Sequence, residues 1–298
     1  MAGYRAVIEA AHNIQQPFAG QMTAAGKVQP AKVLVVGAGV AGLAAIQLAK
    51  KKGAIVYGFD VRSAAKEQVE SCGAKFLEVE LTEDGSGAGG YAKEMSPEWF
   101  AAADAMLLKE CANMNVIITT ALIPGRKAPV LIKKNMVEAM PAGGVTVDLA
   151  APAGGNIETT VPGEVVVFGD NKITCVGYTN IESRMGRTAS YLYGGNVTNF
   201  LMSMEDKEDK TWKINLEDPA VRSIICSQGG ERLSPYVPPA PPAPKPPTEA
   251  ELAKAAEAAK PRDYLEEYKK SAMFTTGMHY SVLFYSILQY TILQLTLL

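Results

Sequence analysis

The sequence predicts an α/β fold built around a doubly wound, mostly parallel β-sheet. Short runs rich in valine and isoleucine alternate with helical stretches between residues 31 and 179, and these runs contain few polar residues. Such strands are typical of a parallel sheet that helices cover on both faces. The predicted strands are residues 33–36, 55–59, 75–79, 116–119, 145–149, 165–168 and 173–176, and the predicted helices include 40–52, 64–72, 97–112 and 129–139.

A glycine fingerprint follows the first strand and refines this prediction to a Rossmann-type fold. Gly37, Gly39 and Gly42 have the spacing GxGxxG, and Asp60 stands at the end of the second strand. Gly37 permits a tight turn, Gly39 lets a pyrophosphate approach the backbone, and Gly42 allows the helix to pack closely on the sheet. The helix then offers its unpaired N–H groups to the phosphates. The alternative is a purely structural turn, which does not explain why an acidic residue ends the second strand.

Asp60 favours NAD(H) over NADP(H) as the bound cofactor. A carboxylate accepts hydrogen bonds from both hydroxyls of the adenosine ribose, whereas a 2′-phosphate would meet a like charge. Arg62 complicates this prediction, since a nearby arginine can accommodate that phosphate. We interpret Arg62 as a second-row contact to the cofactor, and its alternative is a solvated charge at the start of a helix.

A glycine-rich loop between the third strand and the helix at 97–112 is the most unusual connection. Residues 85–90 are all glycine, serine or alanine, and Tyr91 and Met95 follow them. Long loops in compact domains are often lids or binding elements. We therefore weigh two interpretations of the loop equally: a cover for the bound cofactor, closed by Tyr91, or a disordered surface insertion.

Composition excludes several classes of function. The net charge of −2 gives no basic surface for nucleic acid. The four cysteines and two histidines have no metal-ligand spacing, so no metal site is expected. No acid–base pair accompanies the fingerprint, and no catalytic residue is assigned. The chain opens inside a helical pattern near Tyr4 without a signal or transit sequence, which suggests a missing upstream part.

The C-terminal third changes character twice. Residues 235–247 contain eight prolines in thirteen positions, which predicts an extended spacer of roughly 40 Å at ~3.1 Å per residue. An SH3-type ligand is the alternative interpretation of these prolines. Residues 271–298 contain no Asp, Glu, Lys or Arg and follow Lys269 and Lys270, as expected for a membrane segment with a basic flank. An artefactual or truncated terminus is the competing explanation.

These features divide the chain into five segments. We expect a helical remnant of an incomplete second Rossmann-like domain at 1–30, the NAD(H)-binding domain at 31–179, and a segment at 180–234 that returns to the incomplete domain through a helix near 187–204. A linker rich in proline and alanine follows at 235–262, and the apolar segment occupies 263–298. The helical segments on both sides of the sheet should expose apolar surface, so a homodimer or aggregate is expected.

Several motifs resemble those of proton-translocating NAD(P) transhydrogenase, in its NAD(H)-binding component, which is similar to alanine dehydrogenase. The resemblance covers residues 2–233 approximately. The motifs are GYRAVIE at 3–9, TAAG at 23–26 before the fingerprint, DVRSAAKEQVES at 60–71, GGYAKEM at 89–95, TTALIPG at 119–125, DLA at 148–150 and AGGN at 153–156.

This resemblance implies the site residues and the activity. The residues that it implies to contact NAD(H) are Ala38, Gly39, Val40, Asp60, Val61, Arg62, Gly90 and Leu122. It also implies that the loop bearing Tyr91 closes over the cofactor. The family's upstream region, its membrane domain and its NADP(H)-binding domain are absent from this sequence.

The implied reaction is hydride transfer from NADH, held here, to NADP⁺ on the absent domain, coupled to proton translocation. The expected partners are that NADP(H)-binding domain and a proton-channel membrane domain, and the expected location is the inner membrane of a bacterium or mitochondrion. Direct transfer between two nicotinamides needs apposition and exclusion of water, and no general base. Two alternatives stay open: an amino-acid dehydrogenase of the alanine type, and an NAD-binding module without chemistry.

Overall fold

A computed structural model describes residues 1–79, 95–122, 126–206 and 210–236. Gly90, Tyr91, most of the proline-rich spacer and the whole apolar segment lie outside these ranges, so the predictions for them are not tested. Within the described ranges, no helix combines the length and apolar character needed to cross a membrane. The described elements fall within one compact unit, Met1–Pro241.

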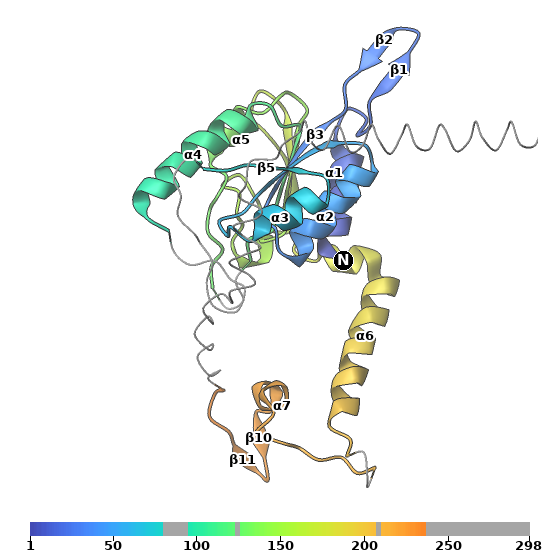
Figure 1. The fold of residues 1–298 in the computed structure, drawn as a ribbon, viewed down its shortest axis with the longest axis vertical. Helices are drawn as coiled ribbons and strands as arrows, with labels where there is room; N and C mark the ends of the chain where they lie inside the picture. Colours follow the sequence, from blue (N-terminus) through green and yellow to red (C-terminus); the bar gives the residue numbers. More distant parts are fainter. Residues whose placement is uncertain (80–94, 123–125, 207–209, 237–298) are drawn as a thin grey trace, which may run out of the picture. The chain divides into compact units, whose positions relative to one another are not determined.

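The described residues form the elements labelled in Figure 1. The helices are α1 (Ala2–Asn13), α2 (Val40–Lys51), α3 (Ala65–Ser71), α4 (Pro97–Cys111), α5 (Lys134–Glu138), α6 (Gly186–Ser203) and α7 (Pro219–Ile224), with short 3₁₀ helices η2 (Ala151–Ala153) and η3 (Ile181–Met185). The strands are β1 (Gln21–Thr23), β2 (Gly26–Val28), β3 (Lys32–Val36), β4 (Ile55–Phe59), β5 (Lys75–Phe76), β6 (Val116–Thr119), β7 (Val145–Asp148), β8 (Val165–Phe168), β9 (Ile173–Val176), β10 (Ser227–Gln228) and β11 (Glu231–Arg232).

The central sheet has seven strands in the order β5-β4-β3-β6-β7-β9-β8. All neighbours pair in parallel except β8, which runs antiparallel to β9 at the edge. The chain builds the sheet outward from β3 in one direction and then returns to place β6 on the other side of β3. This doubly wound topology confirms the predicted fold class. It also creates a switch point between β3 and β6, where ligands of open α/β sheets bind at the carboxyl ends of the strands.

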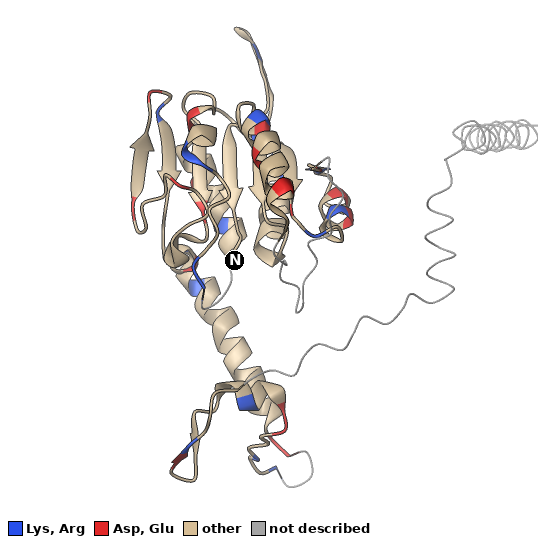
Figure 2. Ribbon diagram, turned by 90° about the vertical axis from the view of Figure 1, so that its left-hand side faces the viewer, with Lys and Arg blue, Asp and Glu red and all other residues tan. Residues whose placement is uncertain are grey.

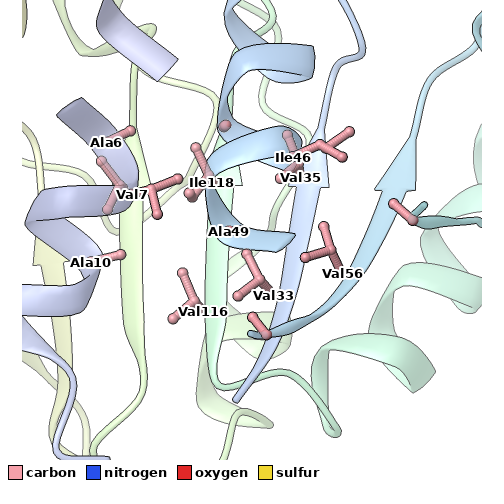
Figure 3. Close-up of a cluster of buried hydrophobic side chains, with 14 of the residues drawn as sticks. Ala6, Val7, Ala10, Val33, Val35, Ile46, Ala49, Val56, Val116 and Ile118 are labelled. Atoms are coloured by element: carbon pink, nitrogen blue, oxygen red, sulfur yellow. The ribbon is translucent and has the colours of Figure 1, made fainter. Parts of the chain in front are cut away.

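Helices cover both faces of the sheet, and successive residues of each strand point to opposite faces. Val33 and Val35 of β3 pack with α1, α2 and α3 in one buried cluster, part of which is drawn in Figure 3. Leu34 and Val36 pack with α4 and α5 in a second cluster. This double coverage explains why the strands carry almost no charge, as Figure 2 shows: charged residues gather on the helices and loops.

Helix α4 begins where its sequence predicts. Ser96 is the N-cap, and its Oγ accepts a hydrogen bond from the backbone N–H of Trp99 at 3.2 Å. Pro97 occupies the first helical position, where its missing N–H costs nothing. The Trp99 ring then stacks on Phe59 at the end of β4, with 6.1 Å between ring centroids.

Two predicted elements are shorter than expected. The strand predicted at 75–79 is only the two residues of β5, because it lies at the sheet edge and pairs with β4 alone. The helix predicted at 129–139 is only α5. Ahead of it, Leu131 and Ile132 donate backbone hydrogen bonds to Asn156, and Glu158 donates back to Ile132. Residues 131–132 are therefore extended, because they pair with the loop after β7 instead of turning into a helix.

Two hairpins were not predicted. The β1–β2 hairpin lies within the segment expected to be a helical remnant and extends away from the sheet (Figure 1). The β10–β11 hairpin lies in the return segment. Both contain only two or three residues per strand, too few for a periodic pattern. The helix predicted near 187–204 is α6, and none of its residues is buried.

Helix α1 packs directly on the sheet. Its Ala6, Val7 and Ala10 are fully buried beside β6 and β7, and α1 contributes to the same cluster as α2 (Figure 3). Glu9 on this helix is also buried and forms ion pairs with Arg5 at 2.7 Å and with Arg184 of η3 at 3.8 Å. The assignment of residues 1–30 to a neighbouring domain stays a prediction, but α1 covers this sheet as well.

Candidate functional site

The candidate site begins at the turn between β3 and α2. Gly37 has a φ angle of +97°, which a residue with a side chain adopts only under strain. Its N–H donates to the carbonyl of Phe59 on β4 at 2.8 Å. An added Cβ at Gly37 would lie 2.5 Å from Thr120 Oγ1, at the end of β6. The turn is therefore fixed by both neighbouring strands.

The other two glycines of the fingerprint differ sharply in their surroundings. A Cβ added at Gly42 would lie 1.8 Å from the Gly37 carbonyl oxygen, so α2 can start this close to the strand only with glycine there. A Cβ added at Gly39 would meet no atom of the described residues within 4 Å. Packing within the described part of the chain therefore does not require glycine at position 39, whereas a ligand approaching the backbone would.

The N-terminus of α2 begins at this same turn, next to Gly39. Gly39 is the N-cap and has no side chain that could cap the helix, and the first turn of α2 carries no acidic residue. The first N–H groups of a helix have no partner within it, and they carry the positive end of the helix dipole. Val40, the first helical residue, is 91% exposed although it is apolar. This arrangement suits a phosphate group beside an apolar contact.

Asp60 connects the end of β4 to this turn. Its Oδ2 accepts a hydrogen bond from the backbone N–H of Ala38 at 2.7 Å and from Arg62 Nη2 at 2.8 Å. Its Oδ1 accepts from the backbone N–H of Arg62 at 2.9 Å and from Arg62 Nε at 2.8 Å. The structure therefore brings Ala38, Asp60 and Arg62 together. Arg62 was interpreted as a second-row contact to a cofactor, and the structure shows its guanidinium bound to Asp60.

The pKa of the Asp60 carboxyl group is lowered from its ordinary value. Burial alone would raise this pKa, but the hydrogen bonds from the Arg62 side chain and from the backbone of Ala38 and Arg62 outweigh burial. The same contact raises the pKa of Arg62. Both groups are therefore charged at neutral pH.

This lowered pKa predicts how Asp60 stabilises the fold as pH changes. A carboxyl group with a lower pKa in the folded state stabilises it fully above the unfolded value of about 3.9 and loses this effect as pH falls through the folded value. The difference in unfolding free energy between the wild type and Asp60→Asn should therefore be constant above about pH 5 and shrink below about pH 4. Urea unfolding at several pH values measures it. A difference that grows in acid would contradict the ion pair.

Thr120 and Asn156 hold the loop after β6 against the fingerprint, and neither was assigned a role from the sequence. Thr120 Oγ1 donates a hydrogen bond to the Gly37 carbonyl at 3.0 Å. Asn156 accepts from the N–H of Ala121 at 3.0 Å and donates to the Ala121 carbonyl at 2.9 Å. Leu122 follows these anchored residues and is 45% exposed at the same edge of the sheet. It thus follows Thr120 and Ala121, the residues that lie against the turn at Gly37.

The buried carboxylate of Asp148 holds together the loops that follow β6 and β7. This residue ends β7, is 1% exposed and accepts five hydrogen bonds. The donors are Thr119 Oγ1 (3.2 Å), Ala150 N (2.9 Å), Asn156 N (2.8 Å), Ile157 N (3.0 Å) and Thr160 Oγ1 (2.7 Å). Asp148 and Asn156 belong to the motifs DLA and AGGN, which were noted only for their resemblance to a family, and the spacing of the motifs does not show that one carboxylate binds both loops.

The structure thus brings most of the predicted site residues to one edge. Gly37, Ala38, Gly39, Val40 and Gly42 form the turn and helix start, and Asp60 joins them through Ala38. Val61 is half-buried and packs toward the α4 side of the sheet. Whether these residues contact a cofactor stays a prediction.

Comparisons with known proteins give the family. The family described as alanine dehydrogenase/PNT, C-terminal domain, matches residues 6–235. The NAD(P) transhydrogenase subunit alpha of Haemophilus influenzae is 49% identical over 235 residues, which are 79% of this chain and 46% of that protein. Alanine dehydrogenase of Methanococcus maripaludis is 27% identical over 210 residues, covering 68% of this chain and 50% of that protein.

A solved structure agrees with these relatives. The crystal structure of transhydrogenase from Sinorhizobium meliloti is 40% identical, with a TM-score of 0.67, and covers 78% of this chain and 61% of that chain. The present chain spans about half the length of the curated relatives that it matches. The chain belongs to the alanine dehydrogenase/PNT family, and its resemblance to the transhydrogenase alpha subunit is confirmed.

Proposed function

We propose that this chain is the NAD(H)-binding part of a proton-translocating transhydrogenase. The observation that carries the proposal is the edge at β3 and β4, where the open backbone at Gly39 lies beside the ionised carboxylate of Asp60. The first fits a pyrophosphate and the second fits a ribose diol. The names of the relatives, NAD(P) transhydrogenase subunit alpha, support the same reaction.

The residues of this chain bind and orient, and the bound dinucleotide supplies the hydride. Gly37 and Gly42 shape the turn, the first turn of α2 faces the phosphates, and Asp60 takes the adenosine ribose. Val40 and Leu122 offer apolar contacts that would exclude water from the cofactor. NADP⁺ would be held by a separate domain, so this chain alone should bind NADH without turnover.

The proposed assembly extends beyond this chain. The partners would be an NADP(H)-binding domain and a membrane domain that conducts protons, in the inner membrane of a bacterium or mitochondrion. The name "subunit alpha" of the relatives supports a complex with several parts. The segment boundaries at 30, 179, 234 and 262 belong to this proposal. So does a homodimer, which the exposed apolar residues of α6, such as Tyr191 and Leu192, support.

Replacing Asp60 with alanine tests the cofactor assignment. Hydrogen bonds to a charged group contribute about 1.5–3 kcal/mol each, so the dissociation constant for NADH should rise by roughly tenfold to 100-fold. NADPH should bind better than to the wild type, because the repelling carboxylate is gone and Arg62 remains. Titration of the full chain, followed by NADH fluorescence, measures both constants.

Asp104→Ala is the matched control, since Asp104 is a half-exposed carboxylate on α4 that pairs with Lys133. It should leave both dissociation constants unchanged. A wild type that prefers NADPH to NADH would refute the assignment. The coupled reaction needs the complete complex, in which NADH should reduce an NADP analogue directly.

An NAD-dependent alanine dehydrogenase is the second candidate, and its support is the lower identity of 27% to the Methanococcus relative. The two candidates differ in the second substrate. A transhydrogenase complex reduces an NADP analogue with NADH and ignores alanine, whereas an alanine dehydrogenase releases ammonia from alanine. The third alternative, an NAD-binding part without chemistry, predicts binding of NADH and no reaction in either assay.

A further inference from the structure

The Asp60 carboxylate has no acceptor position left for a ribose. A carboxylate offers about four lone-pair positions on its two oxygens. Four donors fill them, the backbone N–H of Ala38 and Arg62 and the Nε and Nη2 groups of Arg62, all between 2.7 and 2.9 Å. A ribose diol that donates one or two hydrogen bonds to Asp60 must therefore displace one or two of these donors.

The four donors differ in how easily they can leave. The Ala38 N–H is fixed in the fingerprint turn between β3 and α2, where Ala38 is 1% exposed. The Arg62 N–H closes a short turn with Asp60, two residues earlier in the chain. The guanidinium sits on a long side chain that is 23% exposed, whereas the Asp60 side chain is only 7% exposed. Only the guanidinium can withdraw without rebuilding the backbone.

We propose that Arg62 is a latch on the ribose-binding carboxylate, which NAD(H) must open. Without cofactor, the guanidinium pairs with the poorly exposed Asp60 and so avoids an unpaired buried charge. The adenosine ribose then takes the place of Nε and Nη2, while the Ala38 and Arg62 N–H groups keep their hydrogen bonds. This inference rests on the proposed function, because it assigns the diol of NAD(H) to Asp60.

The latch sets the affinity of the ribose subsite. Each time the ribose binds, the bidentate ion pair between Arg62 and Asp60 must break. The observed affinity for the ribose is therefore lower than it would be if Asp60 were not paired with Arg62. After release, the guanidinium stays beside the ribose, since its backbone is held by Asp60. A contact of Arg62 with the bound cofactor is therefore compatible with the latch. As a latch, Arg62 affects cofactor binding only when Asp60 is present. As a direct contact, it affects binding whether or not Asp60 is present.

A double-mutant cycle on the full chain tests the latch, with ADP-ribose as the probe because it carries the diol and lacks nicotinamide. Arg62→Ala should bind ADP-ribose roughly threefold to tenfold more tightly than the wild type, as expected for a partly buried ion pair. In the Asp60→Ala background, Arg62→Ala should give no gain. Lys66→Ala removes a nearby exposed cation paired with Glu78 and is the matched control, with no change expected.

An NMR measurement shows whether the ribose displaces the Arg62 guanidinium from Asp60. The Arg62 Nε–H signal in NMR, assigned by its loss in Arg62→Lys, should be protected from exchange in the free protein. NADH should shift this signal and remove its protection, whereas an NAD analogue with a 2′,3′-dideoxy adenosine ribose should leave it unchanged.

The outcomes are distinguishable from failure of the proposed function. A wild-type chain that binds neither NADH nor ADP-ribose refutes the proposed function itself. A wild type that binds both, with Arg62→Ala binding equally or more weakly, overturns the latch alone. An equal gain in both Asp60 backgrounds, or an Nε–H signal that NADH does not move, also overturns it.

Discussion

Replacing Asp148 with alanine is expected to lower the free energy of unfolding by about 3–5 kcal/mol, the range for breaking a buried polar network. The carboxylate is 1% exposed and accepts five hydrogen bonds. Three of the donors are backbone N–H groups, which cannot turn to find other partners. Alanine would leave all five donors facing a cavity, and a water entering it would satisfy only some of them. Urea unfolding measures the loss.

Two further variants make this prediction decisive. Asp148→Asn can keep its oxygen on the donors of Asn156, Ile157 and Thr160, but it then turns an NH₂ group toward the Ala150 N–H and Thr119, so an intermediate loss of about 2–3 kcal/mol is expected. This variant gives the measurement if Asp148→Ala does not fold. Asp104→Ala removes a half-exposed carboxylate and should cost less than about 1 kcal/mol. Equal losses in Asp148→Asn and Asp104→Ala would show that the buried network contributes little.

The functional consequence follows from what Asp148 holds. Through the backbone of Asn156 it fixes the loop after β7, and the Asn156 side chain fixes Ala121 beside the fingerprint. The position of the backbone before Leu122 thus depends on the Asp148 carboxylate. A destabilised loop should weaken NADH binding even where the rest of the sheet stays folded.

The sheet could be predicted from the sequence because its physical cause is local. Each strand is a short run of apolar residues, and helices cover both faces, so Val33 and Leu34 are buried on opposite sides. Glycine at 37 and 42 marks the end of β3 and the start of α2, because few other residues fit there. With right-handed crossover connections, the reversal of strand order at β3 then places helices on both faces of the sheet.

The anchoring network could not be predicted, because its partners are set by tertiary contacts. Residues 131–132 read as part of a helix, but they pair with the chain near Asn156. Nothing in the spacing of Asp148 and Asn156 shows that the carboxylate accepts the Asn156 N–H. Arg62 is a similar case, since the sequence predicted a second-row contact to a cofactor and gave no sign that the guanidinium binds Asp60. Side chains that fold back on the backbone leave no periodic signal.

The two glycines at 39 and 42 should respond in opposite ways to the same added methyl group. In Gly42→Ala the Cβ would lie 1.8 Å from the Gly37 carbonyl oxygen, so backbone must move, at an expected cost of roughly 3 kcal/mol in unfolding free energy. In Gly39→Ala the Cβ meets no atom of the residues that the structure describes within 4 Å, and the φ of −76° suits alanine, so the unfolding free energy should change by less than about 1 kcal/mol.

NADH binding should be weakened by both substitutions, although only Gly42→Ala lowers the unfolding free energy strongly. If the pyrophosphate lies against the Gly39 backbone, a Cβ there overlaps with it, and the NADH dissociation constant should rise by roughly tenfold to 100-fold in a fully folded protein. Gly39→Ala thus separates binding from folding, whereas Gly42→Ala impairs both. Urea unfolding and NADH titration on the same samples measure the pair. A methyl group at the predicted contact would weaken binding. If Gly39→Ala binds NADH as tightly as the wild type, the phosphates therefore do not lie against Gly39.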